Sequence, residues 1–151
     1  LWLDAAEFER LLAQADRLFK RDPATAVSLY RQALALYDGD YLQAYPYYDW
    51  ASAEQERLLT LYLRSSERLA QALAAQAAWA EVATVCQAIL SHDDCWEEAY
   101  RLLMLAYDGL GNRAQALQTY ERCRETLQRK WGVEPMPDTV QIYEGIRQSS
   151  P

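Results

Sequence analysis

The sequence predicts an all-α fold, and three observations support this class. Five glycines and five prolines stand among 151 residues, whereas good helix formers such as alanine, leucine and glutamine are abundant. Apolar residues recur every three or four positions through most of the chain, which is the period of one helix face. Cap residues such as Asp22, Asn112 and Gly132 separate these periodic segments. No convincing strand pattern is present, so we expect about seven helices.

The first three helices are indicated by their N-terminal residues. Asp4 followed by Glu7 resembles a capping box, which predicts a helix over residues 5–20. Asp22 is an N-cap residue and Pro23 suits the first helical position, so a second helix should run to residue 38. Asp49 can cap a long third helix through residue 76. The apolar face of this helix comprises Leu58, Leu59, Leu61, Tyr62, Leu69 and Leu73.

Four more helices follow at shorter intervals. We expect them over residues 79–90, 96–110, 113–131 and 137–148. Asp94 and Glu97 have the spacing of a second capping box, and Asn112 is an N-cap residue for the sixth helix. Gly132 is expected to end that helix in the left-handed conformation. Pro137 suits the first position of the last helix.

Residues 100–123 have the spacing of a helix-turn-helix repeat of the tetratricopeptide type. The key residues are Tyr100, Leu103, Tyr107, Gly111, Ala116, Tyr120 and Cys123. In such a repeat large residues fill the space between the helices, glycine permits the turn, and alanine permits close approach. Val82, Cys86 and Ile89 repeat the last three positions about 34 residues earlier. A third, degenerate copy has Ala26, Tyr30 and Ala33. The pattern predicts one domain over residues 1–151, built as a stack of helical repeats.

The charge of the chain argues against direct DNA binding. A net charge of −7 repels the phosphate backbone, whereas DNA-binding domains usually present a basic face. The sixth predicted helix nevertheless contains a cationic strip: Arg113, Arg122, Arg124, Arg129 and Lys130, with Glu121 and Glu125 beside it. We interpret this strip as a solvated helix face with ordinary ion pairs between neighbouring turns. DNA would then be contacted only through a domain outside this chain.

The sequence offers no convincing catalytic site. The single histidine, His92, stands beside Asp93, Asp94 and Cys95, but no second ligand occurs at zinc-binding spacing. Motifs that cradle phosphates or bind dinucleotides are also missing. We therefore expect no enzyme activity, no cofactor and no metal, and we interpret residues 92–95 as a polar turn between repeats.

Cysteine usage and hydropathy favour a cytoplasmic protein. Two of the three cysteines, Cys86 and Cys123, occupy repeat-core positions, where buried thiols are expected in a reducing compartment; the third is Cys95. No apolar stretch is long enough to cross a bilayer, and no secretory leader opens the chain. Because the chain begins without methionine, we expect it to be a piece of a longer protein.

Two segments resemble one bacterial family. The first comprises residues 36–42, 48–51 and 56–58, which read LYDGDYL, YDWA and ERL. The second comprises Leu103-Met104, Ala116-Leu117, Tyr120 and Gly132-Val133-Glu134-Pro135. Both are similar to the bacterial transcriptional activator domain found in SARP-type antibiotic regulatory proteins. Ala77 and Asp94 depart from the pattern, because glycine and proline are frequent at those positions. The resemblance implies a transcription regulator in which a winged-helix DNA-binding domain precedes this domain, with Trp2-Leu3-Asp4 at the join.

An aromatic cluster in the insertion between the first two repeats is a candidate interaction site. It comprises Tyr41, Tyr45, Tyr47, Tyr48 and Trp50. Tyrosine and tryptophan give large, rigid contact areas and are enriched at interface hot spots. The alternative is that these rings pack the insertion onto the third helix.

The concave face of the repeat stack is a second candidate, because such faces commonly bind protein segments. If Leu69 and Leu103 are core positions, six polar residues turn toward that face: Arg64, Glu67 and Gln71, and Glu98, Arg101 and Asp108. We expect charge reversal of Arg64 and Arg101 to weaken partner binding without unfolding the protein. The alternative is that these are solvated polar faces.

Together these observations predict a non-catalytic interaction domain of a bacterial transcription regulator. It would couple a DNA-binding module to protein partners such as polymerase or a signalling module. A small-ligand sensor and a free-standing adaptor are the alternatives that the sequence leaves open. An exposed aromatic loop would also be compatible with a homodimer.

Overall fold

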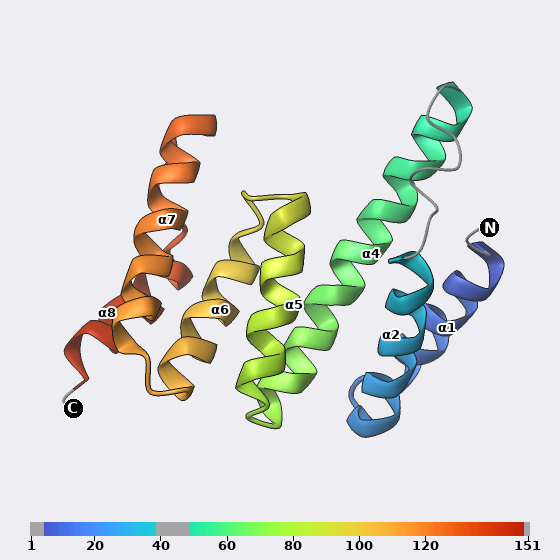
Figure 1. Ribbon diagram of the computed structural model, residues 1–151, viewed down its shortest axis with the longest axis horizontal. Coiled ribbons are helices and arrows are strands. Elements are labelled where there is room, and N and C mark those ends of the chain that lie inside the picture. Colours follow the sequence, from blue (N-terminus) through green and yellow to red (C-terminus); the bar gives the residue numbers. More distant parts are fainter. Residues whose placement is uncertain (1–4, 39–48, 150–151) are drawn as a thin grey trace. The chain divides into compact units, whose positions relative to one another are not determined.

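The computed structural model describes residues 5–38 and 49–149, and side chains over 5–38 and 53–149. The described residues form seven helices and no strand, which confirms the all-α prediction (Figure 1). The helices are α1 (Ala5–Leu18), α2 (Pro23–Tyr37), α4 (Asp49–Ala75), α5 (Trp79–His92), α6 (Glu97–Gly109), α7 (Arg113–Trp131) and α8 (Pro137–Gln148). All seven predicted helices are present, and their ends differ from the predicted ones by no more than about two residues. None of these helices combines the length and the apolar composition needed to cross a membrane.

The chain divides into two compact units, Leu1–Ala72 and Leu73–Pro151, and the boundary falls inside α4. The repeat pattern predicts one domain, and this remains a prediction. In the first unit α1 and α2 form a helical hairpin (Figure 1). Asp22 caps α2 as predicted, because its side chain accepts a hydrogen bond from the Thr25 backbone N–H at 3.3 Å.

The core of the first unit is rich in aromatic rings. The Tyr37 ring lies 5.7 Å from Phe8 of α1 and 4.3 Å from Tyr62 of α4, measured between ring centroids. Tyr30 and Leu58 are also fully buried. Burying such large rings is the main source of stability for a helix trio of this size, since the hydrophobic gain scales with the apolar area removed from water. The aromatic contacts therefore join α4 to the α1–α2 hairpin.

In the second unit α5, α6 and α7 follow one another as antiparallel neighbours, and α8 packs against both α6 and α7. The predicted repeat positions are in the core: Tyr100, Leu103, Ala116 and Cys123 have at most 1% exposure. Tyr120 of α7 stacks on Tyr143 of α8 with 3.9 Å between ring centroids. Cys86 and Cys123 are buried as predicted, and burial raises the pKa of the Cys123 thiol to about 12.

Two helix-ending turns of the second unit have the same geometry and stand one repeat apart. At the end of α4, Ala77 N–H bonds to the Ala74 carbonyl and Ala78 N–H to the Leu73 carbonyl. After α6, Gly111 and Asn112 make the equivalent bonds to Asp108 and Tyr107. These are Schellman turns, which need a left-handed residue just beyond the helix. Ala77 has φ +56° and Gly111 has φ +79°. At position 77, where glycine is frequent in the resembling family, this chain has alanine. A residue with a side chain therefore takes a backbone conformation that favours glycine.

Replacing Ala77 with glycine should stabilise the protein. The left-handed conformation costs a residue with a Cβ roughly 1 to 2 kcal/mol, part of which the greater freedom of glycine in the unfolded chain offsets. We expect Ala77→Gly to raise the free energy of unfolding by about 0.5 to 1 kcal/mol. Gly111→Ala should lower it by a similar amount, because no atom lies within 4 Å of its added Cβ and only the φ strain acts. Urea denaturation followed by circular dichroism measures both; changes of the same sign would contradict this explanation.

Gly109, the last residue of α6, permits a close contact with the first residue of α5. A Cβ added there would lie 2.3 Å from Nε1 and 2.5 Å from Cδ1 of the Trp79 indole. Real Cβ atoms do not approach other atoms so closely, so either the indole or the α6 terminus would have to move. The absence of a side chain at Gly109 therefore lets the indole lie directly against the helix end.

We expect Gly109→Ala to destabilise the protein by about 1 to 3 kcal/mol, the usual cost of overpacking. Gly145→Ala is a matched control, since Gly145 is also helical and its added Cβ meets no atom within 4 Å. That control should gain roughly 0.5 to 1 kcal/mol from better helix propensity. Thermal unfolding of the two variants tests the contact with Trp79. If Gly109→Ala were as stable as Gly145→Ala, the indole contact would have no energetic weight.

Candidate functional site

The first unit contains a groove between the end of α1 and the middle of α4. It has a volume of about 380 Å³ and is lined by Asp16, Arg17, Phe19, Lys20, Glu67, Arg68 and Gln71. A smaller pocket of about 60 Å³ shares Asp16 and Arg68 with it and adds Leu61, Arg64 and Ser65. The α4 residues face the same side because they recur every three or four positions. We call these two adjoining spaces, which share Asp16 and Arg68, the α1–α4 groove.

One ion pair forms the floor of the α1–α4 groove. The Arg68 guanidinium lies 3.1 Å from the Asp16 carboxylate and stands over the Phe19 ring, 5.6 Å from its centroid. The buried Tyr30 hydroxyl donates a hydrogen bond of 2.5 Å to the same carboxylate. Burial, and then this contact with Asp16, raises the pKa of Tyr30 above its ordinary value, so the hydroxyl remains a donor. Arg68 is therefore fixed in place by groups from α1 and from the turn after it.

The three predicted interaction residues of α4 all line this groove. Arg64 is exposed, and Glu67 and Gln71 are partly exposed. The structure places them opposite Arg17 and Lys20 at the end of α1, two residues that the sequence reasoning did not single out. A concentration of basic residues at the end of a helix is common for dipole reasons, so sequence alone gave no signal that they face α4.

The three predicted residues of α6 do not form a comparable surface. Asp108 is exposed, but only 14% of the Arg101 side chain is accessible. Arg101 donates a 2.9 Å hydrogen bond to the Thr139 hydroxyl of α8 and lies 3.5 Å from Glu98. The expected open position of Arg101 is therefore incorrect, because the packing of α8 covers this side chain. Charge reversal of Arg101 would disturb the contact between α6 and α8, so it is not a clean test of partner binding.

The predicted capping box of Asp94 and Glu97 is also wrong. The residue that caps α6 is Trp96, and no side chain bonds to the first turn of that helix. Glu97 instead accepts hydrogen bonds from the Met136 backbone N–H, at 2.7 Å, and from the Thr139 hydroxyl. Its carboxylate thus lies at the N-terminus of α8, where the helix dipole favours negative charge. The donors at the start of α8 therefore bind this carboxylate in place of the backbone N–H groups of α6.

Glu97→Ala should therefore loosen α8. It would remove one of the two carboxylates beside the largely buried Arg101, and with it the acceptor of the Met136 and Thr139 donors, for which we expect a loss of about 2 to 4 kcal/mol in unfolding free energy. Glu98→Ala is the matched control, since Glu98 is more exposed and its 3.5 Å contact with Arg101 should be worth less than about 1 kcal/mol. Urea denaturation measures both, and equal losses would refute a special role for Glu97.

The aromatic cluster of the insertion lies outside the described residues. This holds for Tyr41, Tyr45, Tyr47 and Tyr48, and for the side chain of Trp50 at the beginning of α4. Their proposed part in binding remains a prediction.

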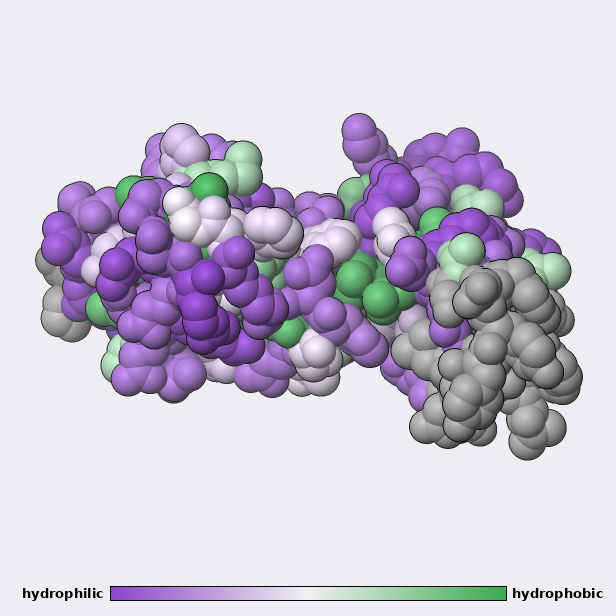
Figure 2. Space-filling view, turned by 90° about the horizontal axis from the view of Figure 1, so that it is seen from above, coloured by the Kyte–Doolittle hydropathy of each residue, from purple (hydrophilic) through white to green (hydrophobic). Residues whose placement is uncertain are grey.

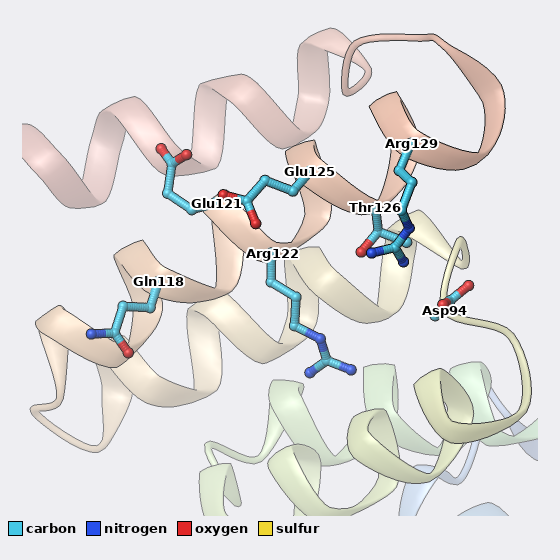
Figure 3. Close-up of a pocket in the computed structure, with 7 residues that line it drawn as sticks. All are labelled: Asp94, Gln118, Glu121, Arg122, Glu125, Thr126 and Arg129. Atoms are coloured by element: carbon cyan, nitrogen blue, oxygen red, sulfur yellow. The ribbon is translucent and has the colours of Figure 1, made fainter.

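The second unit contains a polar pocket of about 450 Å³ along α7 (Figure 3). It is lined by Asp94, Gln118, Glu121, Arg122, Glu125, Thr126 and Arg129. Figure 3 shows Arg122 and Arg129 on the same side of α7 as Asp94, whereas Glu121 points elsewhere. Positive and negative groups alternate along this pocket. With three carboxylates and two guanidinium groups, the lining has no marked excess of either charge, so it does not favour one class of charged ligand.

The cationic strip of α7 is largely occupied by contacts within the second unit. Arg113 donates to the Ile146 carbonyl at 3.1 Å, Arg124 pairs with Glu121 at 2.9 Å, and Arg122 lies 5.6 Å from the Tyr100 ring centroid. Lys130 lies 2.6 Å from Asp94, and this bond lowers the pKa of the Asp94 carboxyl. Only the Arg124–Glu121 pair joins neighbouring turns of α7 as we expected, whereas the other three contacts join α7 to α8, to α6 and to the turn before α6.

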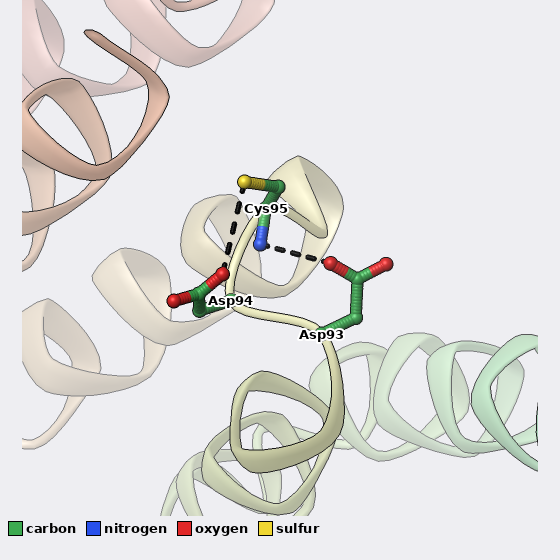
Figure 4. Close-up of side chains that lie close together, drawn as sticks. All are labelled: Asp93, Asp94 and Cys95. Carbon is green, nitrogen blue, oxygen red and sulfur yellow. Dashed lines mark hydrogen bonds between the residues drawn. The ribbon is translucent and has the colours of Figure 1, made fainter. Parts of the chain in front are cut away.

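The acidic turn before α6 has a structural explanation. Ligand atoms of Asp93, Asp94 and Cys95 lie within 4.8 Å of one another (Figure 4). However, Asp93 accepts a 3.0 Å hydrogen bond from the Cys95 backbone N–H, and Asp94 is bound to Lys130. Both carboxylates are thus used within the fold, which fits the interpretation of a polar turn between repeats.

Exposed apolar residues are few on the described surface. The face in Figure 2 is mostly hydrophilic, with hydrophobic side chains in small areas. The end of α7 is an exception, since Trp131 is 70% exposed and Val133 and Met136 are about half exposed. The left-handed Gly132, with φ +63°, turns the chain between Trp131 and Val133 as predicted.

The helical hairpins, small residues at close contacts and Schellman turns define a tetratricopeptide-like repeat domain. In agreement, the chain superposes on the TPR domain of Sgt2 from Aspergillus fumigatus with a TM-score of 0.65 and 17% identity, covering 94% of this chain and 78% of that one. It superposes better on Mycobacterium tuberculosis EmbR, solved in complex with a low-affinity phosphopeptide, with a TM-score of 0.83 and 19% identity over 96% of this chain and 38% of that one. These likenesses establish the fold.

The sequence identifies the family. The profile of the bacterial transcriptional activator domain matches residues 3–147. Regulatory protein AfsR of Streptomyces coelicolor is 30% identical over 150 residues, and AfsR of Streptomyces griseus is 28% identical over 142 residues. The chain belongs to the bacterial transcriptional activator domain family, which confirms the SARP-type resemblance. The two alignments cover 99% and 94% of this chain. The chain spans only 15% and 14% of the length of the two AfsR proteins.

Proposed function

We propose that this chain is the non-catalytic interaction domain of a cytoplasmic bacterial transcription regulator. In this role it couples a DNA-binding module, located elsewhere in the regulator, to a protein partner such as polymerase or a signalling domain. The observation that carries the proposal is the family match over residues 3–147, combined with a surface whose distinctive feature is a charged groove between helices of a repeat stack.

The electrostatics support an indirect contact with DNA. The net charge of −7 opposes binding to phosphates. The cationic strip of α7 is neutralised in part by Glu121 and Asp94 of the same unit. A DNA-binding module outside this chain would therefore supply the affinity, and this domain would supply the contact with the partner.

Comparing the full-length regulator with the isolated chain tests this role. Gel-shift assays on promoter fragments should show binding by the full-length protein and none by the 151-residue chain, at about 50 and about 200 mM salt. A regulator that lacks these residues should still bind its promoter, whereas transcription from a reporter should fall.

Two results would contradict the proposal. Binding of the isolated chain to DNA, with a steep salt dependence, would make the cationic strip of α7 a DNA contact. Failure of the full-length protein to bind any promoter would favour a free-standing adaptor. Ultracentrifugation of the same samples would show whether the domain also forms a homodimer.

A further inference from the structure

We propose that the α1–α4 groove binds an acidic, extended segment of a partner protein, with Arg17, Lys20 and Arg64 as its principal contacts. The proposal rests on the interaction role proposed above and specifies the chemistry of the partner. It follows from the charge of the groove, from the way its cations are held, and from its dimensions.

The side chains that line the groove carry a net positive charge, whereas the chain as a whole is negative. Four cationic side chains line it, namely Arg17, Lys20, Arg64 and Arg68, against the two carboxylates of Asp16 and Glu67. The chain as a whole carries a net charge of −7. A local cationic site on an acidic protein selects for a partner that presents carboxylates locally, since long-range repulsion disfavours large anionic surfaces.

One of the four cationic side chains of the groove makes contacts within the fold, and the other three do not. Arg68 is bound to Asp16 and lies over Phe19, so it forms part of the floor. Among the described residues, no hydrogen bond or ion pair engages the side chains of Arg17, Lys20 or Arg64. These three are therefore available to an external carboxylate.

The position of Arg64 on α4 places it beside a second cation. Arg64 and Arg68 are separated by four residues on one helix, which brings like charges together on successive turns. Arg17 and Lys20 can interact favourably with the C-terminal dipole of α1, but no helix end explains Arg64 in the interior of α4. Because Asp16 already compensates Arg68, an anionic ligand would chiefly compensate the charge of Arg64.

The shape of the groove fits a peptide segment better than nucleic acid. Its volume of about 380 Å³ accommodates a few side chains of an extended strand. The carboxylates of Asp16 and Glu67 lie among the cations, where they would repel a continuous row of phosphates. Gln71 adds an amide that can pair with a peptide backbone.

Fluorescence anisotropy with a labelled peptide of about ten residues, rich in glutamate and aspartate, tests the proposal on the 151-residue chain. We expect saturable binding that weakens between about 50 and about 200 mM salt. The variant R17A/K20A/R64A should bind at least about tenfold more weakly. Its circular dichroism should stay unchanged and its melting temperature should change little, because no hydrogen bond or ion pair of the described residues engages these side chains.

The variant R124A/R129A/R147A is the matched control, since it changes the net charge equally and lies on α7 and α8 of the second unit. It should bind the acidic peptide within about twofold of the unmodified chain, and a peptide with glutamine and asparagine in place of the acids should not bind. Equal weakening by both triple variants would overturn the groove assignment, as would absence of binding. Stronger binding of single-stranded DNA of equal length would overturn the choice of partner. None of these results affects the promoter assays, so the two proposals can fail separately.

Discussion

The second unit depends on the chain reversing direction within a few residues between one helix and the next. In the second unit Ala77, Gly111 and Gly132 each take the left-handed conformation just beyond a helix, and the first two close Schellman turns one repeat apart. Such turns satisfy the last carbonyl groups of one helix while they aim the next helix back along it. Once adjacent helices are antiparallel, their apolar stripes meet and residues such as Tyr100 and Leu103 are buried. The core is thus a consequence of the turns as much as of the apolar pattern.

The protein uses its charged residues in two distinct ways. Arg101 and Glu97 are largely buried, and together with Thr139 they hold the start of α8 against α6. Buried ionic groups of this kind are stable only with nearly all their hydrogen bonds made, so they leave little for a ligand. In the α1–α4 groove, by contrast, the Arg68–Asp16 pair is 43% and 45% exposed, and no hydrogen bond or ion pair of the described residues engages the side chains of Arg17 and Arg64. A charged surface suited to recognition is exposed and has hydrogen-bonding groups without a partner in the fold. A charged contact that serves the fold has neither property.

The family relationship and the fold comparisons support different statements. Identity of 30% to AfsR and the profile match over residues 3–147 establish membership in a family of regulatory domains. The superpositions on EmbR and on the Sgt2 domain, at 19% and 17% identity, support the fold alone. Within the second unit α8 packs on α6 and α7 through the Tyr120–Tyr143 stack and the Glu97 network. This helix covers polar residues of α6 that a simple repeat would leave open.

The sequence by itself determined the helices, their limits and the repeat, because these follow from local rules. Asp22, Asn112 and Gly132 cap helices through groups within three or four residues of them, and the buried stripe follows from spacing along one helix. The same local spacing predicted that Arg64, Glu67 and Gln71 share one face of their helix. The tertiary structure alone decided that Arg17 and Lys20 stand across from them, that Glu97 bonds to the start of α8 rather than to its own helix, and that Arg101 is covered. In each of those cases the partner lies dozens of residues away, and the competition between local and distant hydrogen-bond donors is settled only when the helices pack.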